Sequence, residues 1–379
     1  MSTVAGDHRG RCMLDQLPFE LVVQIMKALP SLSALWSFMN TSARLAAIFR
    51  GAALDITETV VRCTVPDKIQ VLLCAVLRLR SSHFPPSLDV ATETPRASPG
   101  RHRNFPGPAP ATAPEVFWSF VRLAEMIHVL AHDCIEHYRK ACLAMKPFYL
   151  DDPTSIRGYS NILPPPHPEL PKGKPYQPKD TGPPSWAEEQ LVMLNIWRIQ
   201  YYYEIRSAHH AGNLEWTAAE QEELVSMTLP MFYGFRSRPC RQEQLLTVLA
   251  YLQEIKGPEE EGSHPFRLPC PATPVRSDLG CSSEQPKEQL DAYGRTLELE
   301  FRPDSWIFAA IMSRDLKYSP LYGFGLSHWR KFGLALWENK RLIDLGLLAP
   351  KRRVPGWPYY FVWRSILTEE ERNSANADF

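Results

Sequence analysis

The stretch that decides the fold lies near the start of the chain and reads LDQLPFELVVQIMKALPSLSALWSFMNTSARLAAIF, from Leu14 to Phe49. Pro18 suits the first turn of a helix, because the amide proton that proline lacks would have no partner there. Asp15, just before it, suits the positive end of the helix dipole. Apolar residues recur every four positions at Leu17, Leu21, Ile25 and Leu29, with Val22 and Met26 beside them. This spacing predicts a helix of about three turns with one apolar stripe, ended by Pro30.

Two more short helices are expected directly after this one. Ser31 or Ser33 can cap the second helix, and Gly51 suits the end of the third. The spacing of one helix face is shown by Leu32, Leu35, Trp36 and Met39 in the second, and by Leu45, Ile48 and Phe49 in the third. So small a unit cannot bury enough apolar surface to be stable alone. We therefore expect it to pack on the rest of the chain or on a partner.

This stretch resembles the F-box, a three-helix module that docks on a Skp-type adaptor of cullin-RING ubiquitin ligases. The resemblance covers residues 14–50, and its second half is looser: F-boxes often carry a basic residue followed by Trp or Phe after a serine, whereas Ser42, Arg44 and Phe49 are further apart here. It implies a substrate receptor that links an unidentified protein to the adaptor. The residues that it implies for adaptor binding are Leu17, Pro18, Glu20, Leu21, Ile25, Leu29, Pro30 and Leu35.

A second stretch, FGLALWENKRLIDLGLL at residues 332–348, also looks familiar. It resembles the closing helix of fungal F-box-like proteins of unassigned function, which has the form G-x-x-x-W, then an acidic or amide residue, then Arg-Leu. The matching residues are Gly333, Trp337, Glu338, Arg341 and Leu342. From the residues alone, Ser327 caps a terminal amphipathic helix over 327–346. Its expected core residues are Phe332, Leu336, Trp337, Ile343 and Leu347.

Composition indicates a globular chain that binds neither nucleic acid nor membranes. The chain has 379 residues, 44% of them hydrophobic, which is enough for one large or two ordinary domains. Lysine plus arginine equals aspartate plus glutamate at 42 each, so no overall field attracts DNA, RNA or anionic lipid. The first residues lack the apolar core of a signal peptide, and no apolar run is long enough to span a bilayer. We expect a cytoplasmic or nuclear location, or both.

The 35 prolines are concentrated in segments that we expect to be linkers. Residues 83–113 are predicted to be disordered, and flexible insertions are predicted near 151–184 and 257–286. Between them we expect an F-box-like module at 14–50, a helical extension at 51–82 and a helical body over 114–379. The predicted fold class is therefore mainly α, with an irregular helical body.

Local signals place most of the expected helices. Helices are predicted over residues 66–80 and from Pro114 to about Met145, and another begins after Pro239. The remaining signals are two capping boxes, Ser185 with Glu188 and Thr217 with Glu220, and a helical pattern at 304–315. The evidence for strands is limited to YYFVW at 359–363.

The central predicted helix carries the best candidate for chemistry. His128 and His132 are four residues apart and share a face, and Asp133, Cys134 and His137 are nearby. Histidines at this spacing can hold zinc if a third ligand arrives, but Val129 stands where a metalloprotease needs its glutamate. No phosphate-binding loop or nucleophile elbow is present, and no two cysteines form a C-x-x-C pair. We expect neither an enzyme nor a cofactor or metal.

Three readings of the function remain open from the sequence. The first is an F-box-like interaction protein, a possible substrate receptor that links a partner to a ubiquitin ligase through a Skp-type adaptor. The second is a helical scaffold without ligase binding, since leucines every four residues are common in amphipathic helices of ordinary α-helical domains. The third, which the residues favour least, is a metal-dependent enzyme that uses the central histidines.

Overall fold

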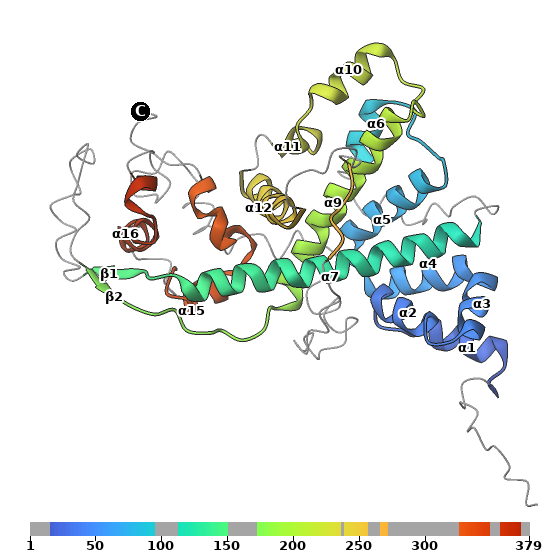
Figure 1. The fold of residues 1–379 in the computed structure, drawn as a ribbon, viewed down its shortest axis with the longest axis horizontal. Helices are drawn as coiled ribbons and strands as arrows, with labels where there is room; N and C mark the ends of the chain where they lie inside the picture. Colours follow the sequence, from blue (N-terminus) through green and yellow to red (C-terminus); the bar gives the residue numbers. More distant parts are fainter. Residues whose placement is uncertain are drawn as a thin grey trace, which may run out of the picture.

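A computed structural model describes residues 16–94, 113–150, 173–235, 239–256, 266–271, 326–348 and 357–372. These residues form a mainly α-helical structure, as the sequence predicts (Figure 1). Among them the only sheet is a two-stranded antiparallel ribbon of β1 (Phe148–Leu150) and β2 (Gly173–Pro175), in which Tyr149 pairs with Lys174.

The helices of the first half begin close to the N-terminus and lead into one long helix. They are α1 (Phe19–Lys27), α2 (Leu32–Met39), α3 (Ala43–Gly51), α4 (Ala53–Thr64), α5 (Asp67–Arg80), α6 (Leu88–Glu93) and α7 (Pro114–Ala144).

The second half combines a second long helix with shorter pieces. These elements are α9 (Trp186–His210), α10 (Ala218–Ser226), α11 (Leu229–Phe232), α12 (Pro239–Lys256), the 3₁₀ helices η5 (Leu326–Phe332) and η6 (Leu334–Leu336), α15 (Asn339–Asp344) and α16 (Trp357–Ser365).

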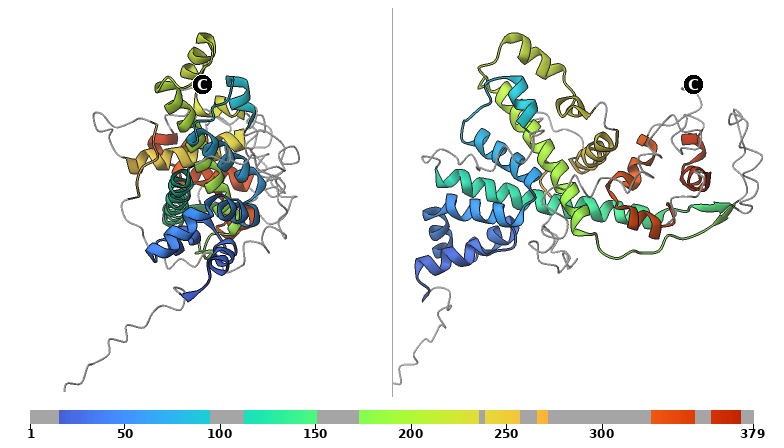
Figure 2. Two further views of the ribbon diagram at one scale, coloured as in Figure 1. Left: turned by 90° about the vertical axis from the view of Figure 1, so that its right-hand side faces the viewer. Right: turned by 180° about the vertical axis from the view of Figure 1, so that it is seen from behind.

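Helix α7 is the axis on which the other elements are arranged. It runs along the long dimension of the molecule, with α2, α3 and α4 on its N-terminal half and η5 on its C-terminal half (Figures 1 and 2). It can pack against elements along its whole length because its buried residues continue from Phe117 to Cys142. Helix α9 crosses it in the middle and packs against both α5 and α12. One continuous apolar core therefore joins the N-terminal and C-terminal parts.

Buried tyrosines show how the core accommodates polar groups. The hydroxyl of Tyr201 donates to the carbonyl of Ala91 at 3.1 Å, and that of Tyr138 donates to the carbonyl of Thr247 at 2.8 Å. A buried tyrosine without such a partner would cost free energy, because its hydroxyl would lose its bonds to water. These bonds tie α9 to α6 and α7 to α12.

Most of the predicted helices are confirmed. Helix α5 covers residues 67–80 and α7 ends at Ala144, just before the expected Met145. Both capping boxes form, since the side chains of Ser185 and Thr217 accept from the amides three residues later while Glu188 and Glu220 bond back. Ser31, not Ser33, caps α2. The six described cysteines are free thiols.

The predicted linkers need correction at their edges. Residues 83–94 are not a disordered linker, because they contain α6, which buries Leu88 and Ala91. Residues 173–184 form β2 and an extended segment that bonds to α7 and α15. Within the third linker Leu268 is buried. The linker residues 95–112, 151–172, 257–265 and 272–286 lie outside the described part, as does the helix predicted at 304–315.

Two predictions near the C-terminus are wrong. The YYFVW segment lies in helix α16, where Trp363 is fully buried and its indole donates to the carbonyl of Leu347. The helix predicted over 327–346 is broken into η5, η6 and α15. The break is at Gly333, which has a left-handed φ of 62° and lies against the ring of Tyr138. Tertiary contact at this glycine therefore overrides the helical periodicity.

Candidate partner-binding surface

Helix α1 has two apolar faces, where the sequence predicted one. Val22, Val23 and Met26 are buried and form the core face. At about 100° per residue, Leu21 and Ile25 lie about 100–150° away from the centre of that face. Leu21 is 51% exposed and Ile25 is partly exposed. The leucines every four residues therefore follow the outer side of the helix, and the core is built by the residues between them.

The other predicted binding residues lie at the two ends of α1. Pro18, one position before the helix rather than in its first turn, is exposed, and so are Glu20 and Pro30. Leu17 and Leu29 are partly buried and pack against the core. The described structure thus places seven of the eight predicted residues on or beside one short helix, where part of each remains accessible: Leu17, Pro18, Glu20, Leu21, Ile25, Leu29 and Pro30.

Leu35 does not belong to this surface. Its side chain, on α2, is 0% exposed and lies in the core of the protein. It therefore cannot touch a partner while the helices keep this arrangement. Leu35 is one of the three buried residues of α2, with Leu32 and Met39, and α2 packs on α3, α4 and α7. Its assignment to partner binding is therefore corrected to a core role.

Phe19 is a surface residue that the sequence argument overlooked. Its side chain is 45% exposed, although it has the same helical direction as the core residues Val23 and Met26. It remains accessible because it is the first residue of α1, and its ring reaches the last turn of α3 near Gly51. The helical periodicity alone would make Phe19 a core residue, and only its position at the start of the helix leaves it accessible.

Aromatic packing on α7 holds the three-helix unit in place. Trp118 makes edge contacts with Trp36 of α2 and Phe49 of α3, with ring centroids 5.4 and 6.0 Å apart. The guanidinium of Arg50 lies 4.6 Å from the centroid of the same tryptophan ring. Contacts of this kind add to the free energy gained by burial. The rigid support leaves α1 as the outer layer, packed on α3 and α4.

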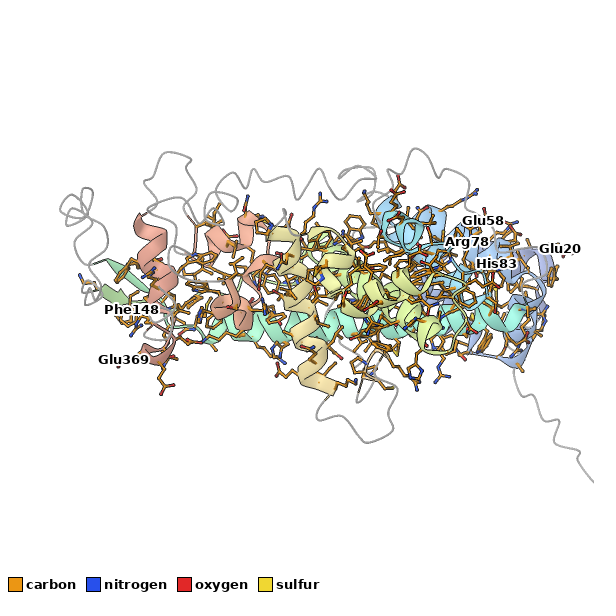
Figure 3. All side chains as sticks on the ribbon, turned by 90° about the horizontal axis from the view of Figure 1, so that it is seen from above. Glu20, Glu58, Arg78, His83, Phe148 and Glu369 are labelled. Carbon is orange, nitrogen blue, oxygen red and sulfur yellow. The ribbon has the colours of Figure 1, made fainter. Side chains whose placement is uncertain are left out.

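Polar contacts fix α1 at both ends. The Nζ of Lys27, in its last turn, lies 2.6 Å from a carboxylate oxygen of Asp55 on α4. At its start, the guanidinium of Arg44 on α3 donates to the carbonyl of Leu17. Figure 3 shows Glu20 at the end of the molecule opposite Phe148 and Glu369. The apolar outer face of α1 is therefore held at one tip of the described structure.

The histidines of α7 do not form a metal site with other described residues. The rings of His128 and His132 are in edge contact, with centroids 4.4 Å apart. Burial lowers the pKa of both, and the neighbouring His132 helps to lower that of His128 to about 4. Within the described ranges no three side chains of His, Cys, Asp or Glu are placed to hold a metal ion. His137 instead lies beside Tyr251 and 3.7 Å from Glu254.

The C-terminal motif is part of the core and not of a surface. Trp337 is 6% exposed, and its indole donates to the sulfur of Cys142 on α7 and to the carbonyl of Phe332. Arg341 is 7% exposed and binds both carboxylate oxygens of Glu188, at 2.9 and 3.0 Å. These contacts explain the spacing of the motif, because they join α15 to α7 and α9.

A second set of exposed apolar side chains lies away from α1. Val90 of α6 is 42% exposed, Val225 of α10 is 53% exposed and Met231 of α11 is 44% exposed. Helices α6 and α10 are in contact, and a bond from the amide of Leu88 to the carboxylate of Glu220 joins them. In the described ranges, no helix is both long and apolar enough to span a bilayer.

Comparison with known proteins found no matching family model, no matching curated protein and no matching solved structure.

Proposed function

We propose that this chain is an interaction protein that binds a Skp-type adaptor through the outer face of α1 and presents another protein to a cullin-RING ubiquitin ligase. The observation that carries the proposal is the exposure of Leu21, 51%, on a helix whose opposite face buries Val22, Val23 and Met26. A large apolar side chain left half in water next to Ile25 gains free energy when a partner covers it. The F-box resemblance of residues 14–50 supports the choice of adaptor.

Three further features support the proposal. The α1–α3 unit rests on α7 through Trp118, so its outer face needs little reordering when a partner binds. Pro18 and Glu20 are exposed beside Leu21, so that a rigid proline ring and a negative charge are accessible to the partner. Leu29 and Pro30 extend the accessible residues to the other end of the helix.

The first test uses purified protein and a purified Skp-type adaptor, with the dissociation constant measured by biolayer interferometry. Leu21→Glu is expected to weaken binding at least about tenfold, because it places a charge in the apolar contact. The matched control is Val225→Glu on α10, since Val225 is 53% exposed and lies on another helix. Both variants are expected to keep the unfolding free energy within about 0.5 kcal/mol of the wild type.

The double variant Pro18→Ala with Glu20→Lys examines the start of the same surface. Both side chains are exposed, so we expect weaker adaptor binding with the melting temperature retained. Unchanged affinity in this variant, or no binding by the wild-type protein, would contradict the adaptor proposal. An equal loss in Leu21→Glu and Val225→Glu would also contradict it.

A helical scaffold without ligase binding is the second candidate. The observation that favours it is the separate set of exposed apolar residues on α6, α10 and α11, namely Val90, Val225 and Met231. If partners are captured there and not at α1, Val225→Glu will reduce capture of co-purifying proteins and Leu21→Glu will not. Mass spectrometry of the co-purified proteins distinguishes the two, since adaptor and cullin peptides are expected only for the first.

A further inference from the structure

Helix α1 begins without a side-chain cap, unlike α2 and α3, the two helices that follow it. The residues that cap α2 and α3, Ser31 and Ser42, each accept a hydrogen bond from an amide of the first helical turn. The residue at the same position of α1 is Pro18, whose side chain has no acceptor. Because α1 has only nine residues, its own backbone bonds give it little stability.

Arg44 contacts the chain at the start of α1 from a different helix, as a hydrogen-bond donor and not as a cap. It is the second residue of α3, and its Nη2 donates to the carbonyl of Leu17, which lies 27 residues earlier in the chain. The next carbonyl, that of Pro18, accepts the first backbone bond of α1 from the amide of Val22 at 3.2 Å. The arginine thus holds the chain immediately before the point where α1 begins.

The position of Arg44 is not explained by helix electrostatics. A cation is unfavourable near the positive N-terminal end of a helix, and Arg44 lies near two such ends, those of α1 and α3. The bond to the carbonyl of Leu17 offsets part of this cost. A bond to a charged donor is stronger than a neutral one, and its planar group restrains the direction of the chain.

We propose that Arg44 is a positioning residue for the outer face of α1: it fixes the Leu17 carbonyl so that Leu17, Pro18 and Leu21 are held ready for the partner. This inference rests on the function proposed above and adds a residue that does not itself lie in the contact.

The test combines amide hydrogen exchange with adaptor binding in the full-length protein. Arg44→Met keeps most of the side-chain length and removes the donors, and Arg44→Lys keeps a charged donor. We expect Arg44→Met to speed exchange about tenfold at Val22, Val23 and Gln24, to leave α5 and α9 unchanged and to weaken adaptor binding about tenfold. Arg44→Lys is expected to retain part of the protection from exchange at these residues and part of the adaptor binding.

The control is Arg62→Met, because Arg62 is an exposed arginine of α4 whose partner Glu58 lies on the same helix. It is expected to change neither measurement. Unchanged exchange at residues 22–24 in Arg44→Met overturns the inference, and so does faster exchange in every helix, which would indicate a merely structural role. If the wild type binds no adaptor, the proposed function fails, whereas the exchange result still decides whether Arg44 holds α1.

Discussion

Glu189 lies next to Glu188 at the start of α9, and both side chains are buried. Glu188 is stabilised by Arg341 and by the amides of Ser185 and Glu338. Burial, together with the charge of Glu188, raises the pKa of Glu189 to about 7. Glu188 therefore has strong partners, whereas Glu189 is protonated more readily than an exposed glutamate.

Stability should depend on pH through Glu189. Because its folded pKa is above the ordinary value of 4.5, the folded protein binds the proton more tightly than the unfolded chain between about pH 4.5 and 7. The resulting stabilisation is complete at low pH and is lost as the pH rises to 7. Glu189→Gln is expected to remove this loss, which amounts to about 3 kcal/mol.

The measurement is urea unfolding of the wild type and Glu189→Gln at pH 5 and pH 8. The free-energy difference between the two proteins should favour the variant more at pH 8. This difference between the two proteins cancels the opposite contribution of His128, whose folded pKa of about 4 is below the ordinary value of 6.5. Parallel pH profiles would show that Glu189 is not coupled to folding.

Gly333 is the residue that breaks the expected C-terminal helix. A Cβ atom there would lie 2.5 Å from Cγ of Tyr138. We expect Gly333→Ala to destabilise the protein by about 1–3 kcal/mol more than Gly212→Ala, because Gly212 also has a positive φ, 70°, but has nothing within 4 Å of its Cβ position. Chemical denaturation of both variants measures the difference. Equal losses would show that backbone conformation alone requires glycine at residue 333.

At the scale of elements, a buried ion pair joins α9 and α15. Arg341 binds Glu188 and also donates to Thr181 and to the carbonyls of Gly182 and Pro183. The guanidinium lies 5.2 Å from the ring centroid of Trp337. One side chain therefore connects the segment before α9, the capping box of α9 and the start of α15. The C-terminal pieces are short and depend on this connection for their position.

Arg341→Met should be strongly destabilising. Removing the arginine leaves the carboxylate of Glu188 buried without its charged partner, which costs about 3–5 kcal/mol. The matched control is Arg330→Met, since Arg330 makes a similar two-point contact with Glu243 but its side chain is 25% exposed. Urea unfolding should show the smaller loss for Arg330→Met, because the carboxylate side chain that remains, Glu243, is 8% exposed, whereas Glu188 is 1% exposed. The opposite order would contradict this account.

Helix boundaries were predictable where the signal was local. Both capping boxes, and the proline that begins α7, depend on residues within one turn of each other. The break at Gly333 was not predictable, because it depends on Tyr138 of α7, nearly two hundred residues earlier. The helix α16 was misread for the same kind of reason, since aromatic residues that favour strands are buried there by long-range packing.

At the scale of the whole molecule, the N-terminal helices depend on α7. Trp118 fills the space between α2 and α3, and α4 packs on the same helix. A peptide spanning residues 14–51 would lack this support and is too small to bury an adequate core. We expect its circular dichroism to show little helix, with no cooperative melting. A cooperatively folded peptide would contradict this and would identify an independent module.

The candidate surface was only partly predictable from the sequence. The four-residue leucine spacing located α1 and selected Leu21 and Ile25, which lie on its outer face. The same reasoning grouped Leu35 with them because core and contact residues have the same chemistry and the same period. It omitted Phe19, which is accessible only because it begins the helix.

The sequence by itself determined the fold class and the starts of the main helices, because periodicity, caps and prolines act within a few residues. It also selected most of the residues proposed to meet a partner. Tertiary structure alone decided which apolar face of α1 is covered, where Arg44 donates and how Arg341 joins distant segments. The physical reason is that burial and pairing depend on residues far apart in the chain, which become neighbours only when the helices pack on α7.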